Sequence, residues 1–300
     1  MDVDTGIDDA VALLLVRSVL GEGLRMVSAV SGNVPVERAL ENTRRVLHLS
    51  GADEVPVFRG ASAPLVAEPM AALWVHGEDG LGGVELEPSP APPAGGLDEL
   101  RAALEREPAP VALLATAPLT NAALLARWDP RLFARRVERI VWMGGSWGRG
   151  NDTPAAEFNA RVDPEAVHIV AGSGVPMTMV GLNATEGCPL DDGDMERIGA
   201  VATRSARLVA TMLGYEGLRR VNRDFGGVVV HDAIAAATLL WPGEVTATRR
   251  YPLTVDLSHG PSYGATLTGP VATGPEVEVA VAADRVRFAQ RLASALARLP

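Results

Sequence analysis

Segments with helical periodicity alternate with short apolar segments along most of this 300-residue chain. Expected strands such as Pro110–Ala115 and Pro176–Gly181 are almost continuously apolar, instead of alternating between apolar and polar residues. Such strands are buried on both faces, which is typical of a parallel sheet whose crossover helices cover it on either side. The sequence therefore predicts an α/β fold with one open, mostly parallel sheet and helices on both faces.

The expected elements follow one another with Gly and Pro residues at the joints. The expected helices span Asp9–Leu20, Val36–Leu49, Leu97–Glu105, Leu119–Arg127, Pro164–Ala171, Asp191–Gly214, His231–Leu240 and Asp284–Leu299. The expected strands span Leu24–Val30, Val55–Phe58, Pro110–Ala115, Arg139–Met143, Pro176–Gly181, Tyr251–Leu257, Tyr263–Thr268 and Val277–Val281. We find no repeat and no domain boundary among them, so we expect a single domain over residues 1–300.

One long region, residues 59–96, lacks helical or strand periodicity and ends in the run Glu-Pro-Ser-Pro-Ala-Pro-Pro-Ala-Gly-Gly. Connections of that length inside a compact domain are usually functional or mobile. We therefore expect a lid followed by a spacer, inserted into the single domain.

All 27 basic residues are arginines, and 37 acidic residues leave a net charge of −10. A field of this sign opposes binding to nucleic acid or to an anionic membrane, and it suits a neutral or cationic small molecule. The sequence has no apolar run near the roughly 20 residues of a membrane span and no signal-peptide pattern, so we expect a cytoplasmic protein. The single cysteine, Cys188, excludes an internal disulfide.

The first ten residues carry four carboxylates, those of Asp2, Asp4, Asp8 and Asp9. Like charges this close repel one another and raise each other's pKa unless a cation or ligand neutralises them. An apolar run follows at Val11, so the carboxylates lie at the mouth of a buried helix. Carboxylate oxygens suit Ca²⁺ or Mg²⁺, because softer metals would require His or Cys. The alternative is that these aspartates only cap the helix or lie at the surface.

Further polar residues follow the expected strands. Ligands of open α/β sheets bind beyond the carboxyl ends of the strands, where such residues gather. The candidate segments are Asp4–Asp9, Ser31–Asn33, Thr116, Gly144–Asn159 and Asn183–Thr185, together with the His231-Asp232 pair that opens a helix.

The acidic pair in Asp2-Val3-Asp4-Thr5 also matches the segment that follows the first strand of haloacid-dehalogenase-type phosphatases. Those enzymes usually hold the phosphate with a downstream lysine, and this chain has none. The doubled Asp8-Asp9 is also unexplained by that family. We keep a phosphatase as an alternative.

A fuller similarity extends over most of the chain. The segment Asp2–Ala10 resembles the signature Asp-x-Asp-Pro-Gly-x-Asp-Asp of the inosine-uridine type nucleoside hydrolases, with Thr5 in place of the proline. Further blocks resemble that family in the same order, namely Ser31–Asn33, Ala115–Asn121, Met143–Gly145, Asn151–Asn159, Asp163–Ala166 and His231–Ala233. The resemblance implies a Rossmann-like nucleoside hydrolase fold and hydrolysis of ribonucleosides to ribose and free nucleobase, as in purine or pyrimidine salvage.

The resemblance also implies a Ca²⁺ cofactor that binds the attacking water and the ribose hydroxyls. Its ligands would be Asp4, Asp9, Asp232 and the carbonyl oxygen of Thr116. Asp4 would also accept the proton of the water as general base. Cleavage of an N-glycosidic bond places positive charge on the ribose ring in the transition state, which anionic and amide groups stabilise.

The sugar-binding residues are implied in the same way. Asp8 and Asn159 would hold the 2-hydroxyl, and Asn159 would act among the catalytic residues. The other sugar contacts would come from Asn33, Asn151 and Glu157, with Met143 packed beneath the ring or, alternatively, serving only as a core residue.

Two histidines are candidates for protonating the departing base. His231 resembles a histidine that faces the base in one branch of the family, and His76 lies in the lid segment Trp74-Val75-His76-Gly77. A histidine with a pKa near the working pH can donate such a proton. The alternatives are that His231 only orients the base and that His76 is a solvated loop residue. The resemblance further implies a homodimer or homotetramer.

Two segments depart from the family pattern. Only Met1 precedes Asp2, where relatives carry several apolar residues of the first strand, so we expect a strand of only a few residues and a loss of stability. Before His231, only Tyr215 and Phe225 supply aromatic rings that could cover the base. A ribose- or nucleoside-binding protein that keeps the pocket without turnover is the other functional alternative.

Overall fold

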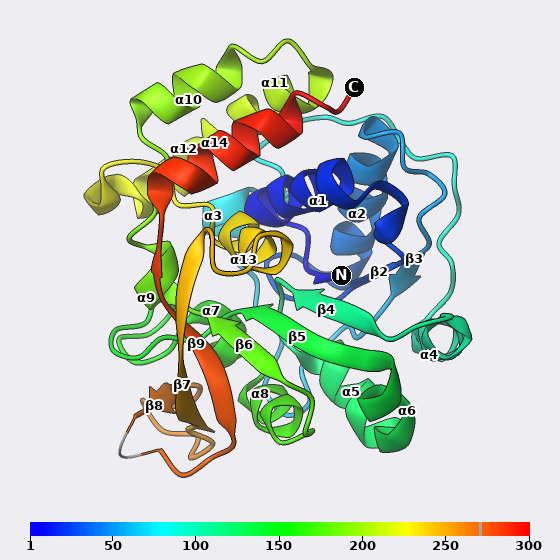
Figure 1. Cartoon of the computed structure of the whole chain (residues 1–300), viewed down its shortest axis with the longest axis vertical. Coiled ribbons are helices and arrows are strands. Elements are labelled where there is room, and N and C mark those ends of the chain that lie inside the picture. The colour runs from blue at the N-terminus through cyan, green and yellow to red at the C-terminus, as the bar shows by residue number, and fades with distance from the viewer. Residues whose placement is uncertain (270–271) are drawn as a thin grey trace.

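The structure, a computed structural model, describes residues 1–269 and 272–300. Within these residues the strands form one nine-stranded sheet in the order β3-β2-β1-β4-β5-β6-β9-β7-β8 (Figure 1). The strands are β1 (Asp2–Val3), β2 (Val27–Ala29), β3 (Val57–Arg59), β4 (Val111–Ala115), β5 (Val137–Met143), β6 (Met177–Val180), β7 (Thr246–Val255), β8 (Thr266–Thr268) and β9 (Glu276–Ala283). The strand order reverses between β1 and β4, which is where open α/β sheets bind ligands.

The sheet is mostly parallel, as predicted. All pairings from β3 across to β9 are parallel. Strand β7 then pairs antiparallel with β9, and β8 pairs antiparallel with β7. The hairpin of β7 and β8 therefore adds an antiparallel edge to the sheet, at the side far from β3.

Helices cover both faces of the sheet (Figure 1), which confirms the predicted architecture. One face carries α1 (Ile7–Leu20), α2 (Val36–Leu49), α11 (Arg204–Leu213), α13 (His231–Leu240) and α14 (Arg285–Leu296) around one apolar core. The other carries α4 (Leu97–Arg106), α5 (Thr120–Trp128), α6 (Pro130–Arg136) and α8 (Pro164–Ala171) around a second core. The remaining helical segments of the described residues are η1 (Gly21–Gly23), α3 (Leu73–His76), α7 (Phe158–Val162), α9 (Leu182–Thr185), α10 (Asp192–Gly199), α12 (Glu216–Val221) and η2 (Arg223–Phe225).

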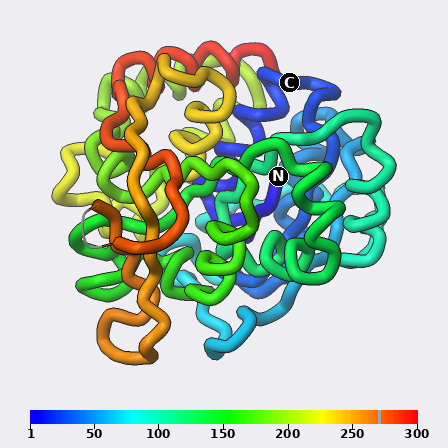
Figure 2. The backbone as a smooth tube through the Cα atoms, turned by 60° about the horizontal axis from the view of Figure 1, so that its bottom comes forward, coloured from blue at the N-terminus to red at the C-terminus, as the bar shows by residue number. Residues whose placement is uncertain are grey.

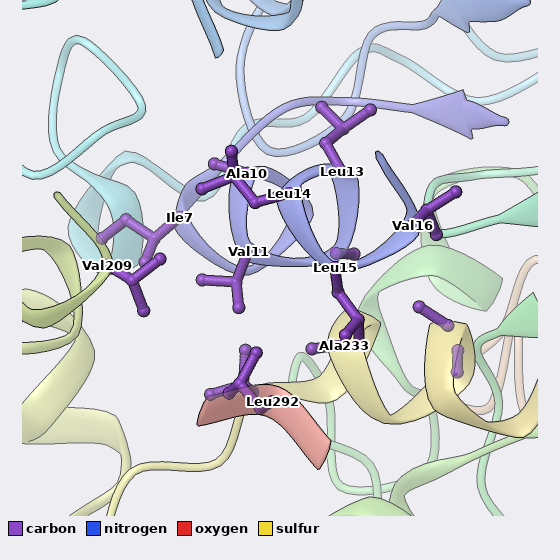
Figure 3. Packing of buried hydrophobic residues seen from close by; sticks show 14 of the residues in the cluster. Ile7, Ala10, Val11, Leu13, Leu14, Leu15, Val16, Val209, Ala233 and Leu292 are labelled. Carbon is purple, nitrogen blue, oxygen red and sulfur yellow. The ribbon is translucent and has the colours of Figure 1, made fainter. Parts of the chain in front are cut away.

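Helix α1 is buried on every side over Ile7–Val16. Its side chains lie close to Val209 of α11, Ala233 of α13 and Leu292 of α14 (Figure 3). A helix that is apolar all round is stable only when other elements surround it. Its first turn, which carries Asp8 and Asp9, is therefore held in the protein interior.

Most predicted boundaries agree with the structure, and α2, α8 and α13 match the predicted ranges end to end. The single helix predicted over Asp191–Gly214 is wrong, because that range contains both α10 and α11. The Thr203 hydroxyl oxygen accepts a hydrogen bond from the Ala206 N–H and caps the start of α11. An internal cap of this kind begins a new helix within one stretch of helical periodicity.

Residues 59–96 run from the end of β3 to the start of α4 and contain α3. Asn42 of α2 holds part of this segment, because its Nδ2 donates to the carbonyl oxygens of Thr5 and Asp79. Helix α3 packs against α12. The division of 59–96 into a lid and a spacer within one domain stays a prediction. Among the described residues, no helix has both the length and the apolar character needed to cross a membrane.

Strand β1 has two residues, in agreement with the short strand expected. Only Ala115 of β4 pairs with it, so within the described residues Val111–Leu114 have no strand partner on that side. An apolar cavity of about 520 Å³ lies here, lined by side chains that include Met1, Met26 and Leu113. The Met1 ammonium group donates to the carbonyl oxygen of Met26 at 2.8 Å.

Candidate active site

A polar pocket of about 280 Å³ lies beyond the carboxyl ends of β1, β4 and β5. Ten of the twelve predicted site residues line it, namely Asp8, Asn33, His76, Thr116, Met143, Asn151, Glu157, Asn159, His231 and Asp232. The other two, Asp4 and Asp9, are fully buried directly behind Asn33 and Thr116. The fold thus brings together residues from seven separate segments of the sequence.

Three carboxylates converge at the inner end of this pocket. Oxygen atoms of Asp8, Asp9 and Asp232 lie within 4.8 Å of one another, and all three side chains are buried. Asp8 and Asp9 lie in the first turn of α1, and Asp232 lies in the first turn of α13, which packs along α1. Asp8 Oδ1 is buried without a hydrogen-bond partner among the described residues. Buried carboxylates this close are unfavourable without a counter-charge, so their chemistry fits a hard divalent cation.

Asp4 lies beside this cluster, on the loop after β1. Its Oδ2 accepts from the backbone N–H of Asn33 at 2.7 Å, and its Oδ1 accepts from Asn33 Nδ2 at 3.1 Å. A Cβ at Gly32 would collide with the Asp4 carboxylate, so the segment after β2 must have glycine there to approach so closely. Burial, and next the charge of Asp9, raises the pKa of Asp4 well above its usual range.

A hydrogen-bond network joins β4, β5 and α7 to the first turn of α1. The Thr116 hydroxyl donates to Asp9 Oδ1 at 2.6 Å. Asn159 Nδ2 donates to the carbonyl oxygens of Thr116 at 3.1 Å and of Met143 at 3.0 Å. No described residue donates to Asn159 Oδ1, which leaves this acceptor for a ligand in the pocket that Asn159 lines.

Glu157 and Asn151 shape the wall of the pocket next to α7. Glu157 caps α7 and accepts from the N–H groups of Asn159 at 3.0 Å, Ala160 at 3.1 Å and Gly145 at 2.7 Å. Burial raises the pKa of Glu157 to about 7, although these three donors oppose the shift. Asn151 Oδ1 accepts from the Phe158 N–H at 2.9 Å, so its amide group is fixed at the pocket surface.

His76 is buried, so the interpretation of it as a solvated loop residue is wrong. Its Nδ1 accepts from the Ile7 N–H at 3.1 Å, at the start of α1, and lies 4.0 Å from Asp8 Oδ1. Burial lowers the pKa of His76 to about 4. The ring is therefore neutral at pH 7, and because Nδ1 is an acceptor, its proton resides on Nε2.

His231 is the first residue of α13, and its Nδ1 lies 2.8 Å from the Thr185 hydroxyl. Thr185 is the last residue of α9 and is fully buried, so it fixes the orientation of the imidazole ring. Burial lowers the pKa of His231, and the nearby charge of Asp8 opposes this shift.

The outer part of the pocket is apolar. Trp74 of α3, Val221 of α12 and Phe225 of η2 line it, and Trp74 is 55% exposed. Tyr215, which was expected to be available to the base, does not line this pocket in the part of the chain that is described. It packs against residues 59–96 instead, where a Cβ at Gly82 would lie 2.9 Å from its ring.

Sequence reasoning missed Trp74 and Glu186 as pocket residues, and it included Arg149 only as part of the segment Gly144–Asn159, without a role of its own. Arg149 Nη2 lies 3.1 Å from Glu186 Oε2, and its guanidinium group lies 5.6 Å from the centre of the Phe225 ring. Arg149 belongs to the polar run that follows β5, and Glu186 directly follows the polar run after β6. Their positions beyond the ends of two strands could have identified both.

A sequence model of the family described as "Inosine-uridine preferring nucleoside hydrolase" matches residues 1–290. The chain belongs to this family. The nucleoside hydrolase is therefore an enzyme that acts on the N-glycosidic bond of nucleosides. Because the family match extends over almost the whole chain, a haloacid-dehalogenase-type phosphatase is no longer an alternative.

Relatives and solved structures agree with this assignment. The nucleoside hydrolase is 39% identical to the pyrimidine-specific ribonucleoside hydrolase RihA of Salmonella paratyphi A, over 99% of this chain and 97% of the relative. Its structure is similar to that of the plant nucleoside hydrolase PpNRh1, with a TM-score of 0.90 and 29% identity over 99% and 97% of the two chains. A purine-preferring ribonucleoside hydrolase from Gardnerella vaginalis gives 0.87 and 27% over 99% and 96%. These similarities confirm the predicted nucleoside hydrolase fold.

Proposed function

We propose that this nucleoside hydrolase cleaves ribonucleosides, and pyrimidine ribonucleosides foremost, to ribose and free base with Ca²⁺ as cofactor. The observation that supports this most is the meeting of the α1 and α13 carboxylates with the amide of Asn159 in one pocket. The preference for pyrimidines is inferred from the 39% identity to RihA, which is named a pyrimidine-specific ribonucleoside hydrolase.

The cation would be held by Asp4, Asp9, Asp232 and the carbonyl oxygen of Thr116. This donor set consists of oxygen atoms alone, which suits Ca²⁺ better than a softer metal. The unpartnered Asp8 Oδ1 and the raised pKa values of Asp4 and Asp232, caused first by burial, support a compensating positive charge here. When bound, Ca²⁺ would polarise the attacking water and bind ribose hydroxyls.

Asp4 would accept the proton of the attacking water. Both of its oxygens are held by Asn33, so the carboxylate has a fixed position at the inner end of the pocket. A general base must lie within hydrogen-bond reach of the proton that it removes. Fixing the carboxylate before the substrate arrives lowers the reorganisation that the reaction requires.

The sugar would be held by Asp8, Asn33, Asn151, Glu157 and Asn159, with Met143 beneath the ring. The buried carboxylates among them would stabilise the positive charge that develops on the ribose as the bond breaks. A buried acceptor without a partner, such as Asp8 Oδ1, also disfavours a sugar that lacks the matching hydroxyl. We therefore propose selectivity for ribose over deoxyribose.

The leaving base would be protonated from His231, whose ring is oriented by Thr185. His76 would contribute differently, because a buried ring with a pKa of about 4 is not in the imidazolium form at pH 7. It can still donate a hydrogen bond from Nε2. The base itself would lie between Trp74 and Phe225 in the outer, apolar part of the pocket, where aromatic stacking contributes about 1 to 3 kcal/mol in other nucleobase sites.

A panel of nucleosides tests this function. The wild-type protein is incubated with uridine, cytidine, inosine, adenosine and deoxyuridine in calcium, and reducing sugar is measured. We expect the largest kcat/KM for uridine or cytidine and the smallest for deoxyuridine. Release of no sugar from any ribonucleoside would contradict the proposed activity, and preferred cleavage of inosine would contradict only the pyrimidine preference. Assembly into a homodimer or homotetramer in the cytoplasm is part of the same proposal, and light scattering tests the assembly.

A further inference from the structure

The antiparallel hairpin of β7 and β8 contacts the loop after β5, which borders the substrate pocket, through the buried side chain of Thr266. We propose that Thr266 of β8 is a positioning residue for the sugar side of the pocket, acting through residues 144–150, the loop after β5. The inference rests on the proposed function, since it concerns the same site. The hairpin lies in the C-terminal part of the chain and forms one side of the molecule (Figure 2).

The Thr266 hydroxyl makes two hydrogen bonds to the backbone of one residue. It accepts from the Ser146 N–H at 2.7 Å and donates to the Ser146 carbonyl oxygen at 2.7 Å. Both residues are buried. Among the described residues, neither backbone group of Ser146 has another hydrogen-bond partner. Loss of the hydroxyl would therefore leave a buried donor and a buried acceptor unpaired, which is unfavourable enough to move the loop.

Ser146 lies at the centre of the loop that forms one wall of the pocket. On one side, the Gly145 N–H donates to Glu157 Oε2 at 2.7 Å. On the other, the Ser146 hydroxyl donates to the Arg149 carbonyl oxygen at 2.6 Å, and Arg149, Gly150 and Asn151 line the pocket. A displacement of Ser146 would thus also displace Glu157 and Asn151, which are both proposed sugar-binding residues.

The loop after β5 and the hairpin are in close contact, which restricts the movement of one relative to the other. Gly145 has a φ of 75°, and a Cβ there would lie 2.9 Å from the Thr266 hydroxyl. The Trp147 ring packs edge-on against Tyr251 of β7, with 5.6 Å between the ring centres. Asn183 Oδ1 accepts from the Trp147 N–H at 2.8 Å. These contacts hold the loop against the hairpin, and Thr266 fixes Ser146, which directly follows the residue that donates to Glu157.

Thr266 touches neither the carboxylate cluster nor His231 in the described structure. The expected defect on losing its hydroxyl is therefore weaker sugar binding with a nearly normal chemical step. Misplacement of a binding wall by a fraction of an ångström lowers kcat/KM on the order of tenfold. A merely structural role would have another signature, because a smaller folded fraction lowers the apparent kcat and leaves KM unchanged.

Three variants test the proposal in the full-length enzyme with uridine and calcium, well below the lowest Tm of the set. Thr266→Val removes the hydroxyl and keeps the shape, and Thr266→Ser keeps the hydroxyl. Thr268→Val is the matched control, because Thr268 lies two residues further on the same strand and its hydroxyl makes no hydrogen bond to a described residue. We expect KM to rise about tenfold in Thr266→Val, with kcat within about threefold of wild type. Thr266→Ser and Thr268→Val should have wild-type KM values.

A wild-type KM in Thr266→Val, a loss confined to kcat, or a Thr266→Ser variant as impaired as Thr266→Val would each overturn the positioning role. Failure of the wild-type enzyme to cleave uridine or any other ribonucleoside would instead overturn the proposed function. The two failures are therefore distinguishable in the same experiment.

Discussion

The two ends of strand β1 differ in how completely the protein fills the space around them. At the carboxyl end, Asp4 and Asp9 each accept at least two hydrogen bonds from loops and helix ends that converge on the site. At the amino end, an apolar cavity of about 520 Å³ adjoins Met1, and most of the neighbouring edge of β4 has no strand partner in the described structure.

This difference separates the determinants of activity from those of stability. A strand of two residues can still position Asp4, because side chains hold it from both sides. Asp2 Oδ1 accepts from the Ser28 hydroxyl at 2.6 Å and from Asn121 Nδ2 at 2.8 Å. Changes at the carboxyl end should therefore alter catalysis, and changes at the amino end should alter mainly the free energy of unfolding.

Asp4→Asn should have the largest effect at the carboxyl end. We expect kcat to fall by about 10³-fold or more, because the amide cannot accept the proton of the attacking water. Asp98→Asn, which removes an exposed carboxylate in the first turn of α4, is the control and should retain full activity. A near-normal rate for Asp4→Asn in saturating calcium would contradict the mechanism.

His231→Ala should lower kcat/KM for uridine by about 10²-fold, since the departing base would no longer receive a proton. The loss should be much smaller for a nitrophenyl riboside, whose leaving group departs as a stable anion. Comparing both substrates in the same assay separates proton donation from orientation of the base. Equal losses on the two substrates would remove the acid role from His231.

Without calcium, the carboxyl end should make the protein less stable as the pH rises. Burial raises the pKa of Asp9 from 3.8 to about 6 and that of Glu157 from 4.5 to about 7. The folded state then binds more protons than the unfolded state between about pH 4 and 7, so the free energy of unfolding falls over that range. His76 acts in the opposite direction, because burial lowers its pKa from 6.5 to about 4. The carboxyl groups with raised pKa values are more numerous than this histidine, so the decrease in the free energy of unfolding prevails.

We therefore expect Tm in EDTA to decrease from pH 5 to pH 7, and calcium to reduce this decrease by neutralising the ionised carboxylates. Thermal unfolding in EDTA and in calcium across that range measures both. A Tm in EDTA that rises with pH would show that the carboxylate cluster is not the dominant titrating region.

Filling the cavity at the amino end should have the smallest effect, and it should affect stability alone. Four apolar residues, Val-Ile-Val-Val, placed before Met1 could extend β1 along the free edge of β4. Burial of one such side chain contributes about 2 kcal/mol, so Tm should rise by several degrees while kcat/KM stays within about twofold. A Gly-Ser-Gly-Ser extension is the control. Equal Tm values for the two extensions would show that the cavity does not accept a strand.

Much of the fold could be predicted because local signals and tertiary packing agree. In α1, α2 and α13 the apolar pattern begins or ends at residues that also begin or end the helix. The division of 191–214 into two helices could not be predicted, because the pattern of α10 continues into α11 and only the hydrogen bond of Thr203 shows the break.

The candidate site was predictable to the extent that its residues stand at strand ends. Asp8, Asn33 and Thr116 follow that rule and line the pocket. Thr185 belongs to the predicted segment Asn183–Thr185, but its contact with His231, 46 positions away, could not be predicted. Thr266 contacts a residue 120 positions away, and nothing in the local sequence distinguishes it from other threonines. Tyr215 failed as a candidate because it packs against Gly82, which is distant in the sequence.

The dependence of uridine cleavage on calcium tests the central claim most directly. The wild-type protein is depleted with EDTA, assayed for release of reducing sugar from uridine, and assayed again after calcium is added back. We expect activity to disappear on depletion and to return with calcium, while an Asp232→Asn variant stays inactive at the same calcium concentration. Undiminished uridine cleavage by fully depleted protein would contradict the account of the carboxyl end of β1 as a calcium-dependent ribohydrolase site.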